Sequence, residues 1–275
     1  MAGTEPTVRL YCFAHAGAGD SVFHRWARST GEGVEPVPVL LPGRGGRRRE
    51  PRLTDHGSLV AHLLDRVRVP AGQSYALYGH SLGAMVAHAL AGALREEGLP
   101  LPSFVAVGAC PPPDAASRLS DACESSDEEL VEALDRLGAL PEGVAARGYW
   151  RRASLPVLRD DLRLAGALRA AARASAPERG PLSVPLLAVS GSRDPLVSPA
   201  TVGGWRRWTS GPVAARTVPG DHFFVRGEAL PRLIGRACRV VRRLEAGGGN
   251  GNGNGNGRWS AETVPPYTRK PAVHP

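Results

Sequence analysis

The sequence predicts an α/β fold in which helices cover both faces of a mostly parallel sheet. Two observations lead to this prediction. Short apolar segments with the character of buried strands recur along the chain, and segments with apolar residues at helical spacing separate them. Such an alternation is typical of a parallel sheet, because each crossover places a helix on one of its faces. The expected strands are 8–14, 34–41, 75–78, 104–108, 185–189 and 213–218.

Apolar spacing predicts the helices. Leu59, Leu63 and Val67 fall on one helical face, and an alanine-rich stretch follows the third expected strand. The expected helices of the sheet region are 22–28, 53–69, 84–95 and 231–244.

The alternation breaks once, between about residues 111 and 181. This stretch contains helical patterns, including 127–137 and 155–173, but no good strand pattern. Ser126 or Asp127 can cap the first of these helices, because short polar side chains accept hydrogen bonds from unpaired N–H groups there. We expect an all-helical insertion that forms a lid.

The length of 275 residues suits one large domain or two small ones. We place one folded domain at 1–246, with the lid insertion at about 111–181. Residues 247–257 are rich in glycine and asparagine and cannot bury apolar surface. We therefore expect 247–275 to be a flexible linker and disordered tail.

Composition excludes several classes of protein. Aromatic residues make up only 5% of the chain and no nucleic-acid-binding motif is present, so the net charge of +8 does not point to nucleic acid. A basic surface can attract an acidic partner, but arginine bias is also typical of a GC-rich genome. No apolar run reaches 18 residues, so no membrane span is expected.

The cysteines and the first residues bear on location. No basic region followed by an apolar stretch opens the sequence, so a secretory signal is not expected. The cysteines show neither a CxxC pair nor zinc-ligand spacing, which indicates reduced thiols in a cytoplasmic protein without a bound metal. They are Cys12, Cys110, Cys123 and Cys238.

The sharpest signal for chemistry is Gly79-His80-Ser81-Leu82-Gly83, a G-x-S-x-G pentapeptide. An expected strand precedes it and an expected helix follows, which is the arrangement of a nucleophile elbow. The turn is so tight that the positions flanking the serine need glycine. Ser81 is therefore the predicted nucleophile, held above the sheet edge at a helix N-terminus.

An acid and a histidine follow in the required order. Asp194 comes just after the strand at 185–189, and His222 just after the strand at 213–218. The order Ser, Asp, His is that of α/β hydrolases, so we predict an α/β-hydrolase fold with a Ser81–His222–Asp194 triad. His222 would take the Ser81 proton, and Asp194 would orient the imidazole and stabilise its charged form. Asp221 is the weaker candidate for the acid, because the side chain of an adjacent residue usually projects elsewhere.

An oxyanion hole needs two N–H groups aimed at the developing negative oxygen. The elbow supplies the backbone N–H of Leu82. The loop after the first strand should supply the second, for which Ala16 is the first choice and Gly17 the second. His15, in the same loop, can line the site.

With these residues placed, the chain resembles the type II thioesterases of polyketide and non-ribosomal peptide biosynthesis over residues 8–244. The likeness rests on stretches beyond the triad, although the acid loop has one aspartate where many members have two. These stretches are Phe13–Gly19, Ser21-Val22-Phe23 with Trp26, Leu41–Gly45, Gly79–Ala84, Leu155–Leu162 and Gly220–Phe224.

The resemblance implies a function that spacing alone does not give. Members hydrolyse acyl groups from the phosphopantetheine arm of acyl or peptidyl carrier proteins, and thereby clear stalled or misprimed chains or release products. No cofactor is implied. Two alternatives stay open: an esterase or an acyl-transferring or cyclising enzyme that uses the same triad, and a catalytically silent partner of a synthase.

Two residue groups have open roles. Apolar lid residues can either form a substrate chamber or pack the lid against the core; they are Trp150, Leu155, Val157 and Leu158. A basic cluster can meet an acidic carrier or the phosphate of its arm, or be a solvated loop. It comprises Arg44, Arg47, Arg48, Arg49 and Arg52.

Overall fold

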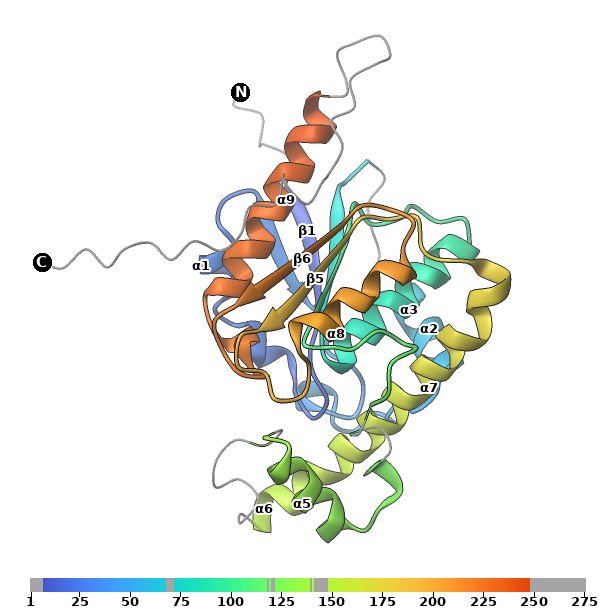
Figure 1. The fold of residues 1–275 in the computed structure, drawn as a ribbon, viewed down its shortest axis with the longest axis vertical. Helices are drawn as coiled ribbons and strands as arrows, with labels where there is room; N and C mark the ends of the chain where they lie inside the picture. Colours follow the sequence, from blue (N-terminus) through green and yellow to red (C-terminus); the bar gives the residue numbers. More distant parts are fainter. Residues whose placement is uncertain are drawn as a thin grey trace, which may run out of the picture.

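The computed structural model describes residues 7–67, 72–117, 119, 122–138, 140 and 148–247. Six parallel strands form one sheet in the order β2-β1-β3-β4-β5-β6 (Figure 1). All six predicted strands are confirmed, with ends that differ by a few residues. Their bounds are β1 Val8–Phe13, β2 Val34–Pro38, β3 Tyr75–His80, β4 Val105–Gly108, β5 Leu186–Gly191 and β6 Val213–Val218.

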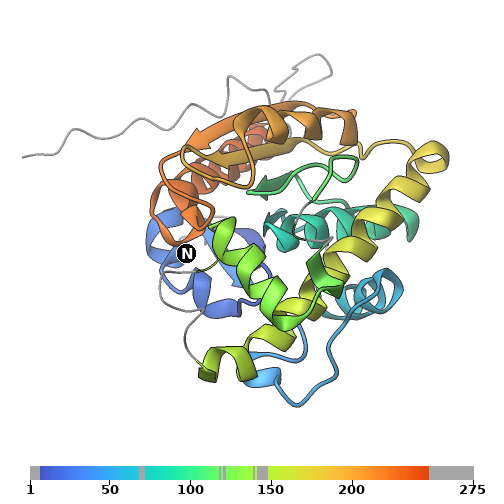
Figure 2. The same ribbon diagram turned by 60° about the horizontal axis from the view of Figure 1, so that its bottom comes forward.

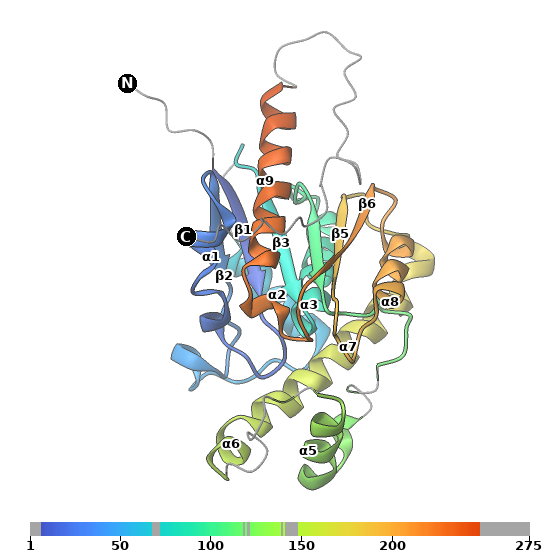
Figure 3. The ribbon, with the colours of Figure 1, turned by 60° about the vertical axis from the view of Figure 1, so that its left-hand side comes forward.

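Helices cover both faces of this sheet, which confirms the predicted α/β class. Helices α2, α3, α7 and α8 pack on one face, and α1 and α9 pack on the other (Figure 3). The α-helices are α1 Trp26–Thr30, α2 His56–Arg66, α3 Leu82–Glu96, α5 Asp127–Arg136, α6 Gly148–Ala153, α7 Leu155–Arg179, α8 Pro199–Gly203 and α9 Ala229–Gly247. Short 3₁₀ helices are Asp20–Phe23, Gly45–Arg47, Ala122–Glu124, Gly204–Trp208 and Phe224–Arg226.

The central strands show why the two faces both hold apolar cores. In β3, Tyr75 and Leu77 join the core on the face of α3, whereas Ala76 and Tyr78 join the core on the face of α9. Successive side chains of a strand point to opposite faces, so a strand covered on both sides is apolar throughout. Every residue of β3 is buried, and this rigid central strand carries the elbow at its carboxyl end.

The described residues between β4 and β5 include the whole of helices α5, α6 and α7 and the 3₁₀ helix Ala122–Glu124. Apolar residues of α5 and of the first turns of α7 make a separate small core, which includes Leu130, Leu134, Leu158 and Leu162. Figures 1 and 3 show α5 and α6 beyond one end of the sheet, with α7 running from them back along the sheet, and Figure 2 has this end turned toward the viewer. This small core therefore stands over the carboxyl ends of the strands.

Helix α5 begins with a capping box. The Ser126 hydroxyl accepts from the Glu129 N–H, and the Glu129 carboxylate accepts from the Ser126 N–H at 2.9 Å. Two otherwise unpaired donors of the first turn are satisfied in this way. Of the two predicted caps, Ser126 is the one used.

The predicted domain boundary lies near the end of the described residues, and most of the predicted linker and tail lies beyond them. The proposed domain boundary near residue 246 lies in the last turn of α9, and residues 248–275 of the predicted linker and tail lie outside the described residues. In the part of the chain that the structure describes, no helix has the length and apolar character needed to cross a bilayer.

Candidate active site

Ser81 lies at a tight turn between β3 and α3. Its backbone has φ 54° and ψ −115°, a conformation that costs a residue other than glycine about 1–3 kcal/mol. The Ser81 N–H donates to the Gly108 carbonyl at 2.8 Å, and the Ser81 carbonyl accepts from the Ala84 N–H at 3.0 Å. Although Ser81 is the N-cap residue of α3, its side chain does not cap the helix. The hydroxyl is therefore left for the cavity that Ser81 lines.

The two glycines of the pentapeptide are required by close backbone contacts. A Cβ atom on Gly79 would lie 1.9 Å from the Gly83 carbonyl oxygen. A Cβ atom on Gly83 would lie 2.1 Å from the Phe13 carbonyl oxygen at the end of β1. Both distances are far inside van der Waals contact, so only glycine lets α3 approach the sheet edge this closely.

His222 and Asp194 meet beside this turn. His222 Nδ1 lies 3.1 and 3.0 Å from the two carboxylate oxygens of Asp194. Asp194 Oδ1 also accepts from the N–H groups of Leu196 and Val197, at 2.9 and 3.2 Å. Both side chains of the pair are buried. A carboxylate held by several donors fixes the orientation of the imidazole ring that it contacts. Here the ring is that of His222, with Nδ1 carrying the proton toward Asp194.

The other candidate acid has a different partner. The Asp221 carboxylate is exposed and accepts from the Phe223 N–H at 2.8 Å, two residues along its own loop. It caps a local turn, while Asp194 supplies the contact to His222.

His80 fixes the backbone of the histidine loop. Its Nε2 lies 2.7 Å from the His222 carbonyl oxygen, and its Nδ1 lies 2.6 Å from the Tyr78 hydroxyl. Complete burial lowers the pKa of His80 well below its ordinary value, so the ring is neutral. A carbonyl only accepts, so Nε2 donates to His222 and Nδ1 accepts from Tyr78. The residue next to the nucleophile thus ties β3 to the loop of His222.

The first loop places Ala16 and Gly17 differently. The Gly17 N–H donates to Asp161 Oδ2 of α7 at 2.7 Å, and the Ala18 N–H donates to the His15 carbonyl at 3.1 Å. No protein partner for the Ala16 N–H is found among the described residues. Ala16 and Leu82 both line the cavity of Ser81. The geometry therefore favours Ala16 over Gly17 as the second oxyanion donor, since the Gly17 N–H is already used.

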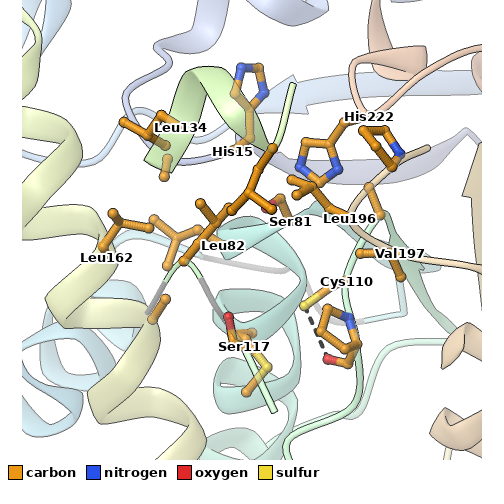
Figure 4. Close-up of a pocket in the computed structure, with 18 of the residues that line it drawn as sticks. His15, Ser81, Leu82, Cys110, Ser117, Leu134, Leu162, Leu196, Val197 and His222 are labelled. Atoms are coloured by element: carbon orange, nitrogen blue, oxygen red, sulfur yellow. Dashed lines mark hydrogen bonds between the residues drawn. The ribbon is translucent and has the colours of Figure 1, made fainter. Parts of the chain in front are cut away.

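The cavity has a volume of about 380 Å³ and lies between Ser81, at the end of β3, and side chains of α5 and α7 that include Leu134 and Leu162 (Figure 4). Ser81, His15 and His222 occupy one part of its wall. Apolar side chains from the lid, α3 and the loop after β5 make much of the rest, among them Leu82, Met85, Leu134, Leu137, Leu158, Leu162, Ala165, Leu196 and Val197.

The lid contributes to the cavity through residues that the sequence interpretation only partly named. Of the four apolar lid residues proposed, Leu158 lines the cavity, whereas Leu155 is buried in the small lid core. Leu162, Ala165 and Arg169 were missed. They follow Leu158 at helical spacing on α7, so the periodicity held a usable signal.

Arg169 is a buried cation in the cavity wall. Its guanidinium donates to the carbonyl oxygens of Pro111, Pro112 and Ala115 at 3.1, 2.8 and 3.2 Å. These bonds fasten the segment after β4 to α7 and close that side of the cavity.

A second cavity of about 720 Å³ adjoins the first. The two share the wall residues His15, Ala16, Leu158 and Phe223. Trp150 lines this second cavity and not the first, as do the exposed Arg25 and Arg226.

His15 stands at the junction of the two cavities as a neutral ring. Burial, with help from the nearby charges of Arg226 and His222, lowers the pKa of His15 to about 3. It packs edge-on against His80 and Phe223, with ring centroids 5.8 and 5.2 Å apart. At neutral pH it contributes shape and polarity to the wall but no charge.

The proposed basic cluster is not one surface. Arg44 is buried and forms a bidentate ion pair with Asp161, at 2.7 and 2.6 Å. This corrects its assignment to a solvated or partner-binding loop. Arg47 pairs with Glu50 and donates to the Leu40 carbonyl. Arg52 pairs with Asp160 on α7. Only Arg48 and Arg49 of the cluster are exposed without an ion pair among the described residues.

No group of three or more histidine, cysteine or acidic side chains arranged to hold a metal ion is found within the described ranges. The four cysteines are buried free thiols.

Comparison with known proteins gives matches over most of the chain. A model of the thioesterase domain matches residues 8–239. The thioesterase PikA5 of Streptomyces venezuelae is 34% identical over 221 residues, which cover 79% of this chain and 75% of that protein. A probable cadicidin biosynthesis thioesterase of Streptomyces griseus is 31% identical over 218 residues; the aligned part is 79% of this chain but only 58% of the relative's length.

A solved structure extends the likeness to the fold. YbtT, a type II thioesterase from the yersiniabactin NRPS/PKS biosynthetic pathway, superposes with a TM-score of 0.73 at 26% identity, covering 88% of this chain and 94% of that one. These matches confirm the predicted α/β-hydrolase fold and the resemblance to type II thioesterases. The matched model spans most of the chain, and the chain therefore belongs to the thioesterase domain family.

Proposed function

We propose that this protein hydrolyses acyl thioesters held on the phosphopantetheine arm of acyl or peptidyl carrier proteins, and so edits or releases chains of a biosynthetic synthase. The observation that carries the proposal is that His222, hydrogen-bonded to the buried Asp194, lines the same apolar cavity as the strained Ser81. Family membership supports the class of reaction.

In the proposed mechanism, Ser81 Oγ attacks the thioester carbonyl carbon while His222 Nε2 takes the hydroxyl proton. Asp194 holds the opposite nitrogen and stabilises the imidazolium that forms. The carbonyl oxygen becomes an oxyanion, which the N–H groups of Ala16 and Leu82 bind. When the carbon–sulfur bond breaks, His222 returns the proton to the leaving thiolate.

The second half of the reaction reuses the same groups. A water molecule gives a proton to His222 and attacks the acyl carbonyl on Ser81. Collapse of this second tetrahedral intermediate releases the carboxylic acid and restores the Ser81 hydroxyl. A thiol has a pKa of roughly 8.5, so the first leaving group needs less help from protonation than an alkoxide does.

The two cavities support a division of the substrate. The apolar cavity suits an acyl chain, because burial of each methylene contributes about 0.8 kcal/mol. We propose that the carrier's arm reaches Ser81 through the second cavity, where the exposed Arg25 and Arg226 can meet its phosphate. A cytoplasmic location stays a prediction from the sequence.

One comparison tests the proposal against its alternatives. We would measure kcat/KM for an acyl-phosphopantetheinyl carrier protein and for an oxygen ester of the same acyl chain. The proposal predicts faster turnover of the carrier thioester. Faster turnover of the oxygen ester, or transfer of the acyl group to an amine or alcohol in place of water, would support the esterase or acyl-transferring alternative instead.

The Ser81→Ala variant separates catalysis from a silent partnership. We expect loss of about 10⁴- to 10⁶-fold in kcat for carrier thioesters, because no other group replaces the nucleophile. A Ser81→Ala protein that is inactive in vitro but fully restores the pathway in cells would show that catalysis is not its role.

A further inference from the structure

A buried ion pair joins the lid helix to the loop that holds the proposed oxyanion donor. Asp161 lies on α7, one residue before the cavity-lining Leu162, and its side chain is 1% exposed. Arg44, in the loop after β2, binds it with two hydrogen bonds of 2.7 and 2.6 Å. The third hydrogen bond to this carboxylate comes from the Gly17 N–H at 2.7 Å.

These contacts fix both peptide units around Ala16. The peptide that contains the Ala16 N–H is held at its other end, because the His15 carbonyl accepts from the Ala18 N–H at 3.1 Å. The next peptide is held by Asp161 through the Gly17 N–H. A peptide unit is planar, so fixing these groups fixes the direction of the Ala16 N–H.

The same turn also packs against the lid helix α7. Gly17 has φ +75°, and a Cβ atom there would lie 3.5 Å from Leu158 Cδ1. Leu158 is one turn before Asp161 on α7, so the helix both packs against the turn and accepts its hydrogen bond.

Arg44 has a second effect on the site. Asp161 contacts Gly17, the residue next to the proposed oxyanion donor Ala16. Without a counter-charge, this buried carboxylate would repel the developing negative oxygen. The bidentate guanidinium neutralises Asp161 and leaves it able to accept from Gly17.

We propose that Asp161 and Arg44 are positioning residues that fix the direction of the Ala16 N–H in the oxyanion hole. Because Asp161 lies on α7, this direction depends on the position of that helix. Neither touches the substrate. This inference rests on the proposed Ser81 mechanism but not on the identity of the acyl donor, so it is tested with a p-nitrophenyl ester.

The decisive variant replaces the pair by apolar residues, Arg44→Met with Asp161→Leu. Leucine has the branching of aspartate, and replacement of a buried ion pair by apolar residues often preserves stability. The Gly17 N–H then has no acceptor. We expect kcat to fall about 10- to 100-fold, part of the effect of losing an oxyanion donor, with KM within about threefold of wild type.

A second readout separates this role from a structural one. An alkyl boronate forms a tetrahedral adduct on Ser81 that places an oxygen in the oxyanion hole. Its affinity should fall in step with kcat/KM in the double variant, whereas binding of an uncleavable amide analogue should be unchanged. The matched control is Asp160→Asn, the neighbouring α7 carboxylate, which pairs with Arg52 and Arg163 and for which no hydrogen bond to the first loop is found among the described residues. Its kcat should stay within about twofold.

Three outcomes would overturn the proposal. One is a folded double variant with wild-type kcat and boronate affinity. Another is an equal loss of affinity for boronate and amide analogue, which would mean a deformed cavity. The last is an equal loss of kcat in Asp160→Asn. If the double variant does not fold, Asp161→Asn, which keeps an oxygen for Gly17, is measured by the same two readouts with the same expectations reduced in size. Failure of carrier-thioester turnover with normal ester turnover would instead count against the proposed function alone.

Discussion

The Gly83→Ala substitution crowds the backbone of the elbow, and the size of its effect follows from the backbone distances. The new Cβ atom would lie 2.1 Å from the Phe13 carbonyl oxygen, 2.6 Å from its carbon and 2.8 Å from the Ala14 carbonyl oxygen. All three are main-chain atoms, so no side chain can rotate away. To restore ordinary contact, the start of α3 has to move by roughly 1 Å away from the end of β1.

That movement separates the two proposed oxyanion donors. Leu82 is the first residue of α3, and Ala16 belongs to the loop that follows β1. A displacement of about 1 Å in a catalytic site can cost about 10²-fold in rate. The crowding also destabilises the fold, typically by about 1–3 kcal/mol, which corresponds to a fall of several degrees in Tm.

The assay pairs this variant with Gly92→Ala in the same helix. A Cβ atom on Gly92 meets nothing within 4 Å, so we expect unchanged kcat/KM and a gain in stability of up to about 1 kcal/mol. Thioester turnover and thermal unfolding are measured for both proteins. Wild-type kcat/KM in Gly83→Ala would refute the link between this close contact and the geometry of the site.

The other predictions concern the acid, the acyl cavity and pH. Asp194→Asn should lower kcat by about 10⁴-fold without unfolding, because the imidazole of His222 is then held in the wrong tautomer; Asp221→Asn is the control, and an equal loss there would contradict the assignment of the acid. Leu162→Trp should shift the preferred acyl group toward shorter chains, measured as the ratio of kcat/KM for long and short thioesters; an unchanged ratio would mean that the chain does not enter this cavity. The pKa of His15 is lowered to about 3 in the folded protein. As the pH falls below about 6.5, His15 therefore takes up a proton in the unfolded state but not in the folded state. Stability should therefore fall with falling pH by about 1.4 kcal/mol per unit from this residue, and His15→Phe should remove that part of the slope in urea unfolding; an unchanged slope would show that His15 is protonated in the fold.

Most of the sheet and the elbow could be predicted because their signals are local. A strand buried on both faces is a short apolar run, and the glycines around Ser81 are required by contacts within a few residues or with the adjacent strand. The order of Asp194 and His222 after successive strands was enough to bring them to one sheet edge, since parallel strands end at the same side.

The contacts that could not be predicted join residues far apart in sequence. Arg44 and Asp161 are separated by 117 positions, and each sits among other charged residues that suggest a solvated surface. Only the packing of α7 against the first loop buries both. The bond from His80 to the His222 carbonyl spans 142 positions and likewise has no local pattern.

The choice between Ala16 and Gly17 shows the same limit. The loop sequence offers several equivalent N–H groups, and glycine is an ordinary candidate for close approach to a substrate. Asp161, on a helix distant in sequence, accepts the hydrogen bond of the Gly17 N–H. The Ala16 N–H therefore stays available for the oxyanion.

The most direct test of the central claim is single-turnover mass spectrometry with an acyl-loaded carrier protein. The carrier should lose the mass of its acyl group, and in a His222→Ala variant that still acylates slowly the same mass should appear on the peptide that contains Ser81. In the wild-type protein the acyl group should end as a free acid. An acyl carrier that stays loaded, or an acyl group found on any residue other than Ser81, would contradict the account.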